Sequence, residues 1–223
     1  LMLAQFPDFD KYDLSCLTKC YYGASIMPVE VLKELMERLP GCKVYNYYGQ
    51  TELAPYHTIL KAEDALAKLG SAGMAGLNME TRLEDADFKP IDAVGTPGEI
   101  CGKGPHAMIM YFKDPEKTED VMRGGWFHSG DIGVLDEDRY ISVVDRKKDM
   151  INVGGEKVFP SEVEDMLLMH HKIKDLVIVG IPDDLKGEAP KAFIQLQEDE
   201  NATEAEIREY CKTQMAPYKV PVA

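Results

Sequence analysis

The chain has 223 residues, of which 45% are hydrophobic, enough for one large domain or two modest ones with buried cores. Its 39 acidic and 25 basic residues give a formal net charge of -14, which repels phosphate backbones and argues against a nucleic-acid partner. No apolar run approaches the roughly 18 to 20 residues of a membrane span and no basic-then-apolar leader opens the chain, so we expect a cytoplasmic protein with no membrane span.

Five cysteines stand in the sequence: Cys16, Cys20, Cys42, Cys101 and Cys211. Their odd number and their lack of paired C-x-x-C spacing favour neither a disulfide framework nor a zinc site, so we expect reduced, mostly buried thiols. The chain opens on "LMLAQF" without an initiator methionine and closes on "KVPVA" without an evident cap. We therefore expect a piece of a longer protein.

The first predicted elements are a helix and a strand. In "MPVEVLKELMERLPG", Pro28 suits a first helical position, apolar residues form one stripe, and the final Pro-Gly pair ends the helix. A strand is expected over 43–48, because this segment is β-branched and aromatic, and Gly49 gives the backbone freedom for a sharp exit. The stretch "YNYYGQTE" (45–52) therefore has two interpretations: a strand entering a turn, or a site where aromatic faces and a carboxylate meet a nucleotide.

The stretch from about 79 to 145 predicts a β-rich subdomain. The runs "METRLED" and "GEICGKG", and two apolar runs around a turn at Asp136 to Asp138, indicate short antiparallel strands, with one helix at "DPEKTEDVM". After "DRKKDMINVGGE" the pattern changes to helix "PSEVEDMLLMHH", strand "DLVIVGI", strand "KAFIQLQ" and helix "TEAEIREYCKTQM". We expect a small α+β domain there, with its boundary near Lys148.

Two polar stretches each admit a structural and a functional interpretation. In "GGWFHSGDIG" (124–133), Asp131 is either a turn-capping carboxylate or an acceptor for two adjacent ribose hydroxyls. The stretch "VVDRKKDMINVGGE" (143–156) is either a solvated turn between domains or a place where Arg146 offers its fork of donors to a ribose or phosphate oxygen. Gly154 and Gly155 would let the backbone approach a ligand closely, although a plain turn explains them equally well.

Six segments, taken together in their order and spacing, resemble one known family. They are "YYGAS" (21–25), "YNYYGQTE", "VGTPGEICGKGP" (94–105), "MYFKDPEKT" (110–118), "GGWFHSGDIGVLDEDRYISVVDRKKDMINVGGEKVFPSEVE" (124–164) and "GEAPKAF" (187–193). The chain resembles, over essentially its whole length, the adenylate-forming superfamily of acyl-CoA synthetases, luciferases and peptide-synthetase adenylation domains. It looks most like the fatty-acyl-CoA ligases, with the aryl-CoA ligases close behind.

The resemblance implies an α/β and α+β fold in two parts. Residues 1–147 would be the C-terminal part of the large AMP-binding domain, including the β-rich subdomain at about 79–145. Residues 148–223 would be the small, mobile C-terminal α+β domain. The implied reaction has two steps: a carboxylic acid, fatty or aromatic, attacks the α-phosphate of ATP to give acyl-adenylate and pyrophosphate, and CoA then displaces AMP. The implied cofactors are ATP/AMP, CoA and Mg2+.

The same resemblance implies roles for residues of the first part. Gly23, Ala24 and Ser25 would flank the adenine, and Gly49 is expected among the cofactor-binding residues. Tyr48 would stack on the base with the flat apolar face of its ring. Thr51 would hydrogen-bond the α-phosphate, and Glu52 would hold the magnesium ion, a hard cation that prefers carboxylate oxygen.

Residues near the expected domain boundary receive roles by resemblance too. Asp131 and Arg146 would bind the ribose. Lys148 would be the hinge on which the small domain pivots between the two half-reactions; as an alternative, it is one more solvated lysine. Gly155 and the segment after it would line the pantetheine tunnel for CoA, with Gly154 beside it.

The sequence also departs from the family pattern. The Gly- and Ser/Thr-rich phosphate loop and the C-terminal glycine-lysine motif are absent, so we expect the C-terminal portion of an acyl-CoA synthetase, inactive by itself. Tyr22 and Met110 stand where many members have glycine. Three hypotheses remain open: a thioester-forming ligase, an adenylation domain that loads a carrier protein, and a non-catalytic nucleotide- or CoA-binding module.

Overall fold

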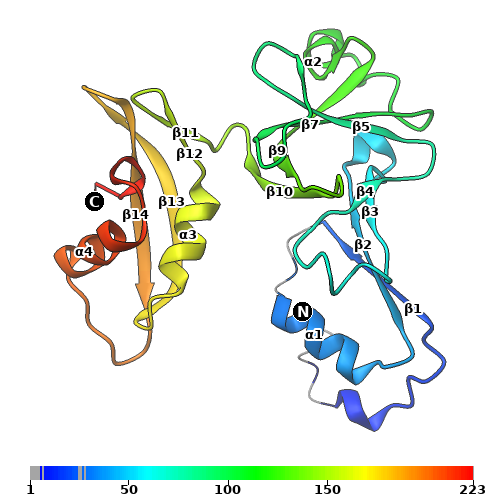
Figure 1. Cartoon of the computed structure of the whole chain (residues 1–223), viewed down its shortest axis with the longest axis horizontal. Helices are drawn as coiled ribbons and strands as arrows, with labels where there is room; N and C mark the ends of the chain where they lie inside the picture. Colours follow the sequence, from blue (N-terminus) through cyan, green and yellow to red (C-terminus); the bar gives the residue numbers. More distant parts are fainter. Residues whose placement is uncertain (1–5, 7, 25–26, 28, 223) are drawn as a thin grey trace. The chain divides into compact units, whose positions relative to one another are not determined.

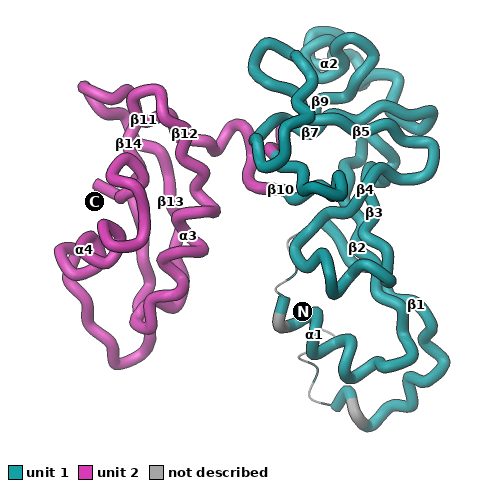
Figure 2. Tube along the Cα trace, viewed as in Figure 1, with its two compact units in different colours: residues 1–129, 133–143 teal, residues 130–132, 144–223 magenta. Residues whose placement is uncertain are grey.

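The structure is a computed structural model that describes residue 6, residues 8–24, residue 27 and residues 29–222. The fold is mixed α/β and mostly sheet. The chain divides into two compact units, one of residues 1–129 with 133–143 and one of residues 130–132 with 144–223 (Figure 2). Among the helices of the described residues, none combines the length and the apolar character needed to cross a lipid bilayer.

The first unit opens with a four-stranded sheet (Figure 1). Its strands, in the order β1-β2-β3-β4, are β1 (Lys19–Gly23), β2 (Lys43–Tyr48), β3 (Thr58–Leu60) and β4 (Met74–Ala75). Strands β1 and β2 are parallel and are joined through helix α1 (Val29–Arg38), whereas β2 and β3 are antiparallel. The predicted helix and the predicted strand over 43–48 are confirmed, although Pro28, the expected first helical position, lies outside the described residues. Short 3-10 turns, η1 (Phe9–Lys11) and η2 (Thr51–Leu53), complete this part.

A second sheet forms the β-rich part of the chain, with the order β10-β9-β7-β5-β6, and β8 paired to β9. Its strands are β5 (Glu80–Glu84), β6 (Pro90–Ile91), β7 (Gly98–Lys103), β8 (Met122–Arg123), β9 (Trp126–Leu135) and β10 (Ile141–Arg146). Strand β5 is antiparallel to both β6 and β7, as the sequence predicted. The predicted helix forms as α2 (Pro115–Val121), where Asp114 accepts a hydrogen bond from Lys117 N at 3.0 Å.

The two faces of this second sheet differ because side chains alternate along a strand. Leu83 and Ile100 lie on one face, in a buried apolar cluster with Leu135 and Ile141. Their neighbours along β5 and β7, which include Glu84 and Cys101, point to the other face and are also buried.

The second unit is an α+β structure with the sheet order β12-β11-β14-β13. Its elements are β11 (Ile151–Val153), β12 (Glu156–Val158), α3 (Pro160–Leu168), β13 (Ile173–Asp183), β14 (Gly187–Leu196), α4 (Glu204–Gln214) and η3 (Pro217–Lys219). The helix predicted over 160–171 ends at Leu168, because the chain forms a tighter turn there, in which His170 N donates to Leu167 O at 3.0 Å. The sequence did not predict the β11–β12 hairpin.

Candidate functional site

The parallel pair β1 and β2 brings two sets of predicted residues together. The register pairs Gly23 with Tyr47, so Gly23 and Ala24 at the end of β1 lie beside Tyr48 and Gly49 at the end of β2. Ligands of open α/β sheets bind outside the carboxyl ends of such strands. Ser25, also predicted to contact the adenine, lies outside the described residues.

Local packing explains both glycines at this edge. A Cβ on Gly23 would lie 2.2 Å from Tyr47 O, and one on Gly49 would lie 2.6 Å from Pro55 O. Ala24 adopts a left-handed backbone with φ of 68°. The strand ends therefore approach their neighbours more closely than a larger residue allows, whatever they bind.

Tyr48 is half-buried and packs against the apolar cluster around Leu83. Its ring lies 5.6 Å, centroid to centroid, from the imidazole of His57. His57 is 1% exposed, and neither ring nitrogen has a hydrogen-bond partner of normal geometry in the described part of the chain. Burial lowers the pKa of His57 to about 4, and the Cys101 backbone opposes that shift only in part. Tyr48 therefore rests on a neutral imidazole, which the sequence analysis did not identify.

Glu52 is held by a residue distant in sequence. The hydroxyl of Tyr111 donates to Glu52 Oε1 at 2.7 Å, and Met108 N donates to Glu52 O at 2.7 Å. Burial, followed by the bond to Glu52, raises the pKa of Tyr111 to about 12, so the phenol keeps its proton. Thr51, the preceding residue, is exposed. The arrangement presents a fixed carboxylate next to an exposed hydroxyl.

The loop that carries Thr51 and Glu52 is also fastened to the second sheet. Gln50 Nε2 donates to Ser129 O, on β9, at 2.8 Å. This bond spans 79 residues of sequence, so only the folded chain could reveal it.

The predicted ribose ligands lie on neighbouring strands of the second sheet. Asp131 lies on β9, and Arg146 is the last residue of β10. The residues next to them are hydrogen-bonded, because Lys147 N donates to Gly130 O at 2.8 Å. Asp131 is half-buried, and Arg146 is exposed. A carboxylate and a guanidinium so placed can accept from and donate to hydroxyl groups.

Lys148 lies in an exposed turn directly after β10. The turn is closed by a bond from Asp149 N to Arg146 O at 3.1 Å. Just before it, Asp145 Oδ2 accepts from Ser161 N at 3.0 Å, which fastens the end of β10 to the start of α3. The compact units divide between residues 143 and 144, upstream of this anchor.

Gly154 and Gly155 form the two-residue turn of the β11–β12 hairpin, with φ values of 64° and 97°. A type I′ hairpin turn needs positive φ at both central residues, so the turn alone requires glycine here. Both are exposed, and a Cβ built on either would meet no atom within 4 Å. The turn therefore leaves room for an approaching ligand.

The described residues form the carboxyl ends of two parallel strands, a carboxylate held by Tyr111 and an α+β unit. Two family matches agree with this arrangement: the AMP-binding enzyme family over residues 1–112 and the AMP-binding enzyme C-terminal domain over residues 162–223. The chain belongs to the AMP-binding enzyme family, the adenylate-forming enzymes.

Several proteins resemble the chain over most of its length. A long-chain-fatty-acid–CoA ligase of Bacillus subtilis (strain 168) is 36% identical over 99% of the chain and 39% of its own length. A 2-succinylbenzoate–CoA ligase of Geobacillus kaustophilus (strain HTA426) is 40% identical over 89% of the chain and 40% of its own length. The structure of o-succinylbenzoate CoA synthetase from Bacillus subtilis with ATP and a magnesium ion has a TM-score of 0.77 and 33% identity, covering 92% of this chain and 41% of that one. The chain thus spans about two fifths of the relatives it matches.

Proposed function

We propose that this chain is the C-terminal portion of an acyl-CoA synthetase, which activates a carboxylic acid with ATP and transfers the acyl group to CoA. One observation carries the proposal: the ends of β1 and β2 bring Ala24 beside Tyr48, and the following turn presents the fixed carboxylate of Glu52. Nucleotides bind at such edges of α/β sheets. The family match over residues 1–112 supports the same interpretation.

In the first half-reaction, the substrate carboxylate attacks the α-phosphorus of ATP, and pyrophosphate leaves. The adenine would lie against the ring of Tyr48, beside the backbone of residues 23 to 25 and Gly49. Thr51 would donate a hydrogen bond to the α-phosphate. These groups do not react themselves; they hold the phosphorus and the carboxylate in position, so catalysis is placement and electrostatics.

Glu52 suits a magnesium ion because the ion prefers hard carboxylate oxygens. The bond from Tyr111 keeps the Glu52 carboxylate in one orientation and occupies only Oε1. Mg2+ bound there would neutralise phosphate charge. The similar synthetase from Bacillus subtilis has been solved with ATP and a magnesium ion, which supports the same pair of cofactors here.

In the nucleotide complex, Asp131 would accept hydrogen bonds from the ribose hydroxyls and Arg146 would donate to ribose oxygens. For the second half-reaction, we propose that the chain pivots at Lys148. Its turn is exposed, whereas the residues just before it are anchored to α3. The open turn at Gly154 and Gly155 would then admit the pantetheine arm of CoA.

The acid that we propose is a fatty acid, because the similar ligase of Bacillus subtilis, matched over 99% of the chain, acts on long-chain fatty acids by its name. We propose a cytoplasmic location. The five cysteines, which all lie in the described part of the chain, form no disulfide, which suits a reducing compartment.

The test uses the full-length protein, because the chain spans about two fifths of its relatives. We expect exchange of pyrophosphate into ATP that depends on a fatty acid, and thioester formation on addition of CoA. Glu52→Gln should reduce exchange at least about tenfold, roughly 1.4 kcal/mol of barrier, whereas Glu37→Gln, on the exposed side of α1, should not. Exchange with an aromatic acid but no fatty acid would refute the substrate class. Transfer to a phosphopantetheinyl carrier but not to CoA would refute the acceptor, and no exchange with any acid would refute the activity.

A further inference from the structure

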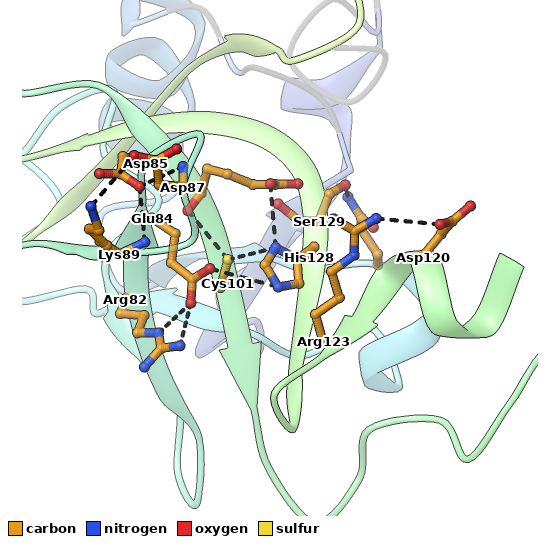
Figure 3. A network of polar contacts seen from close by, with 12 residues as sticks. Arg82, Glu84, Asp85, Asp87, Lys89, Cys101, Asp120, Arg123, His128 and Ser129 are labelled. Carbon is orange, nitrogen blue, oxygen red and sulfur yellow. Dashed lines mark hydrogen bonds and ion pairs between the residues drawn. The ribbon is translucent and has the colours of Figure 1, made fainter. Parts of the chain in front are cut away.

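The second sheet carries a buried polar cluster that the proposed reaction does not use. It comprises Glu84 on β5, Cys101 on β7 and His128 on β9, with Arg82 beside Glu84 (Figure 3). Glu99 on β7 contacts His128 as well. The β5–β7 register pairs Glu84 with Glu99 and Arg82 with Cys101. Because residues two apart share a face of a strand, these side chains meet on the face opposite Leu83 and Ile100.

The three central side chains offer different kinds of ligand atom at short range. One ligand atom of each of Glu84, Cys101 and His128 lies within 4.8 Å of the others. His128 Nε2 is 3.7 Å from Glu84 Oε2, whereas Cys101 Sγ is 3.4 Å from the other ring nitrogen, Nδ1. Zinc bonds of about 2.0 to 2.3 Å place tetrahedral ligands roughly 3.3 to 3.8 Å apart. Ligand atoms up to 4.8 Å apart would have to close by about 1 Å, and Cys101 Sγ would have to turn from Nδ1 towards the Nε2 side of the ring.

The buried carboxylate of Glu84 is independent evidence for a ligand at this cluster. Its side chain is fully enclosed, at 2% exposure. Oε1 accepts from Arg82 Nε at 2.6 Å and pairs with the second guanidinium nitrogen. Oε2, which faces His128, accepts no hydrogen bond from the described residues. A buried carboxylate oxygen without a partner costs free energy, and a cation bound to it would remove that cost.

We propose that Glu84, Cys101 and His128 form a zinc site. A thiolate, an imidazole and a carboxylate are the ligand types that zinc prefers, whereas magnesium and calcium avoid sulfur. Glu99 Oε2 lies 3.4 Å from His128 Nδ1, so it can hold that nitrogen while Nε2, on the Glu84 side, binds the metal. Binding releases the thiol proton of Cys101.

The cluster is closed to solvent, which suits a structural ion rather than a catalytic one. Cys101 is fully buried, His128 is 7% exposed, and the rings of Phe88 and His128 form a T-shaped pair with centroids 5.6 Å apart. A zinc ion there would join β5, β7 and β9, three neighbouring strands. The site shares no residue with the magnesium position that we propose at Glu52.

The experiment uses cobalt and zinc as probes on the purified chain after chelator treatment. The exposed Cys16 and the half-buried Cys20 are first replaced by serine, so that they cannot bind metal adventitiously. We expect one zinc per chain by elemental analysis and, with cobalt, a thiolate-to-metal charge-transfer absorption. Zinc should also raise the Tm of the chain.

Single variants assign the site. Cys101→Ser should abolish the cobalt–thiolate absorption and weaken zinc binding at least tenfold, whereas Cys42→Ser, at a buried cysteine that packs against Leu35 and Leu39 just before β2, should change neither. Glu84→Gln should weaken zinc binding at least tenfold. If Cys101→Ser does not fold, X-ray absorption of the zinc-loaded parent chain decides, with one sulfur and otherwise nitrogen or oxygen neighbours expected. No cobalt–thiolate absorption in the parent chain, its persistence in folded Cys101→Ser, or full zinc affinity in Glu84→Gln would overturn the proposal.

Discussion

The imidazole of His57 should make the stability of the first unit fall steeply in mild acid. Its backbone is tied into the sheet, since His57 N donates to Tyr48 O at 3.0 Å and Gly76 N donates to His57 O at 2.9 Å. The ring cannot reach water without opening that sheet. Burial lowers its pKa to about 4, from 6.5 in an exposed setting. The unfolded chain therefore takes up a proton at a pH where the folded chain does not.

The sign and size of this change in the free energy of unfolding follow from proton linkage. Because the folded-state pKa is the lower one, the neutral His57 contributes its full stability above about pH 7, and that contribution is lost as the pH falls from 6.5 towards 4. The complete loss is about 3 kcal/mol at roughly 1.4 kcal/mol per pKa unit. Between pH 7 and pH 5 the loss is about 2 kcal/mol. Below pH 4 both states are protonated and no further loss occurs.

Urea unfolding followed by the fluorescence of Trp126, the single tryptophan, measures this effect within the first unit. The parent chain should lose about 2 kcal/mol more between pH 7 and pH 5 than His57→Leu, which has no proton to gain. Acidic residues titrate alike in both chains, so the difference isolates His57. Replacing the exposed His171 by glutamine should leave the pH dependence unchanged. Equal losses in the parent chain and His57→Leu would refute the reasoning.

Three further predictions concern the full-length protein. Asp131→Ala should raise the apparent KM for ATP about tenfold or more, since a charge-assisted hydrogen bond is worth roughly 1.5 to 3 kcal/mol; an unchanged ATP dependence would exclude the ribose contact of Asp131. Lys148→Pro should keep acyl-adenylate formation within about tenfold yet largely abolish thioester formation from preformed acyl-adenylate, because proline fixes φ at the pivot; single-turnover rates that fall together, or not at all, would exclude the hinge. Tyr111→Phe should raise the Mg2+ concentration needed for half-maximal adenylation several-fold, because Glu52 loses the bond that orients it, and an unchanged requirement would contradict that positioning role.

The parts of the fold that local sequence determines were predictable. The helix ending before Pro40 and the strand over 43–48 follow from an apolar stripe, a Pro-Gly stop and a β-branched, aromatic run, and both form. The strand around Gly98 and the helix after Asp114 were predicted for similar reasons. In each case neighbours within a few residues supply the signal, so no knowledge of tertiary packing was needed.

Contacts between distant segments could not be predicted in this way. Tyr111 and Glu52 are 59 residues apart in sequence, and nothing near Tyr111 indicates which carboxylate it will meet. The cluster of Glu84, Cys101 and His128 depends on the register of three strands. Cysteine spacing, which argued against zinc, is informative only where ligands lie close together along the chain.

The residues proposed to bind nucleotide differ in how cleanly they can test that proposal. A side chain on Gly23 would clash with Tyr47 O at 2.2 Å, so lost activity in a Gly23 variant would report on packing as much as on binding. A substitution at Gly154 would strain its left-handed backbone, so a Gly154 variant would likewise report on the fold as well as on binding. Thr51 and Arg146, by contrast, have exposed side chains, so Thr51→Val and Arg146→Gln should leave the free energy of unfolding within about 0.5 kcal/mol. A loss of adenylation in those variants without a loss of stability can therefore be assigned to contact with the ligand, and these two residues decide the placement of the nucleotide.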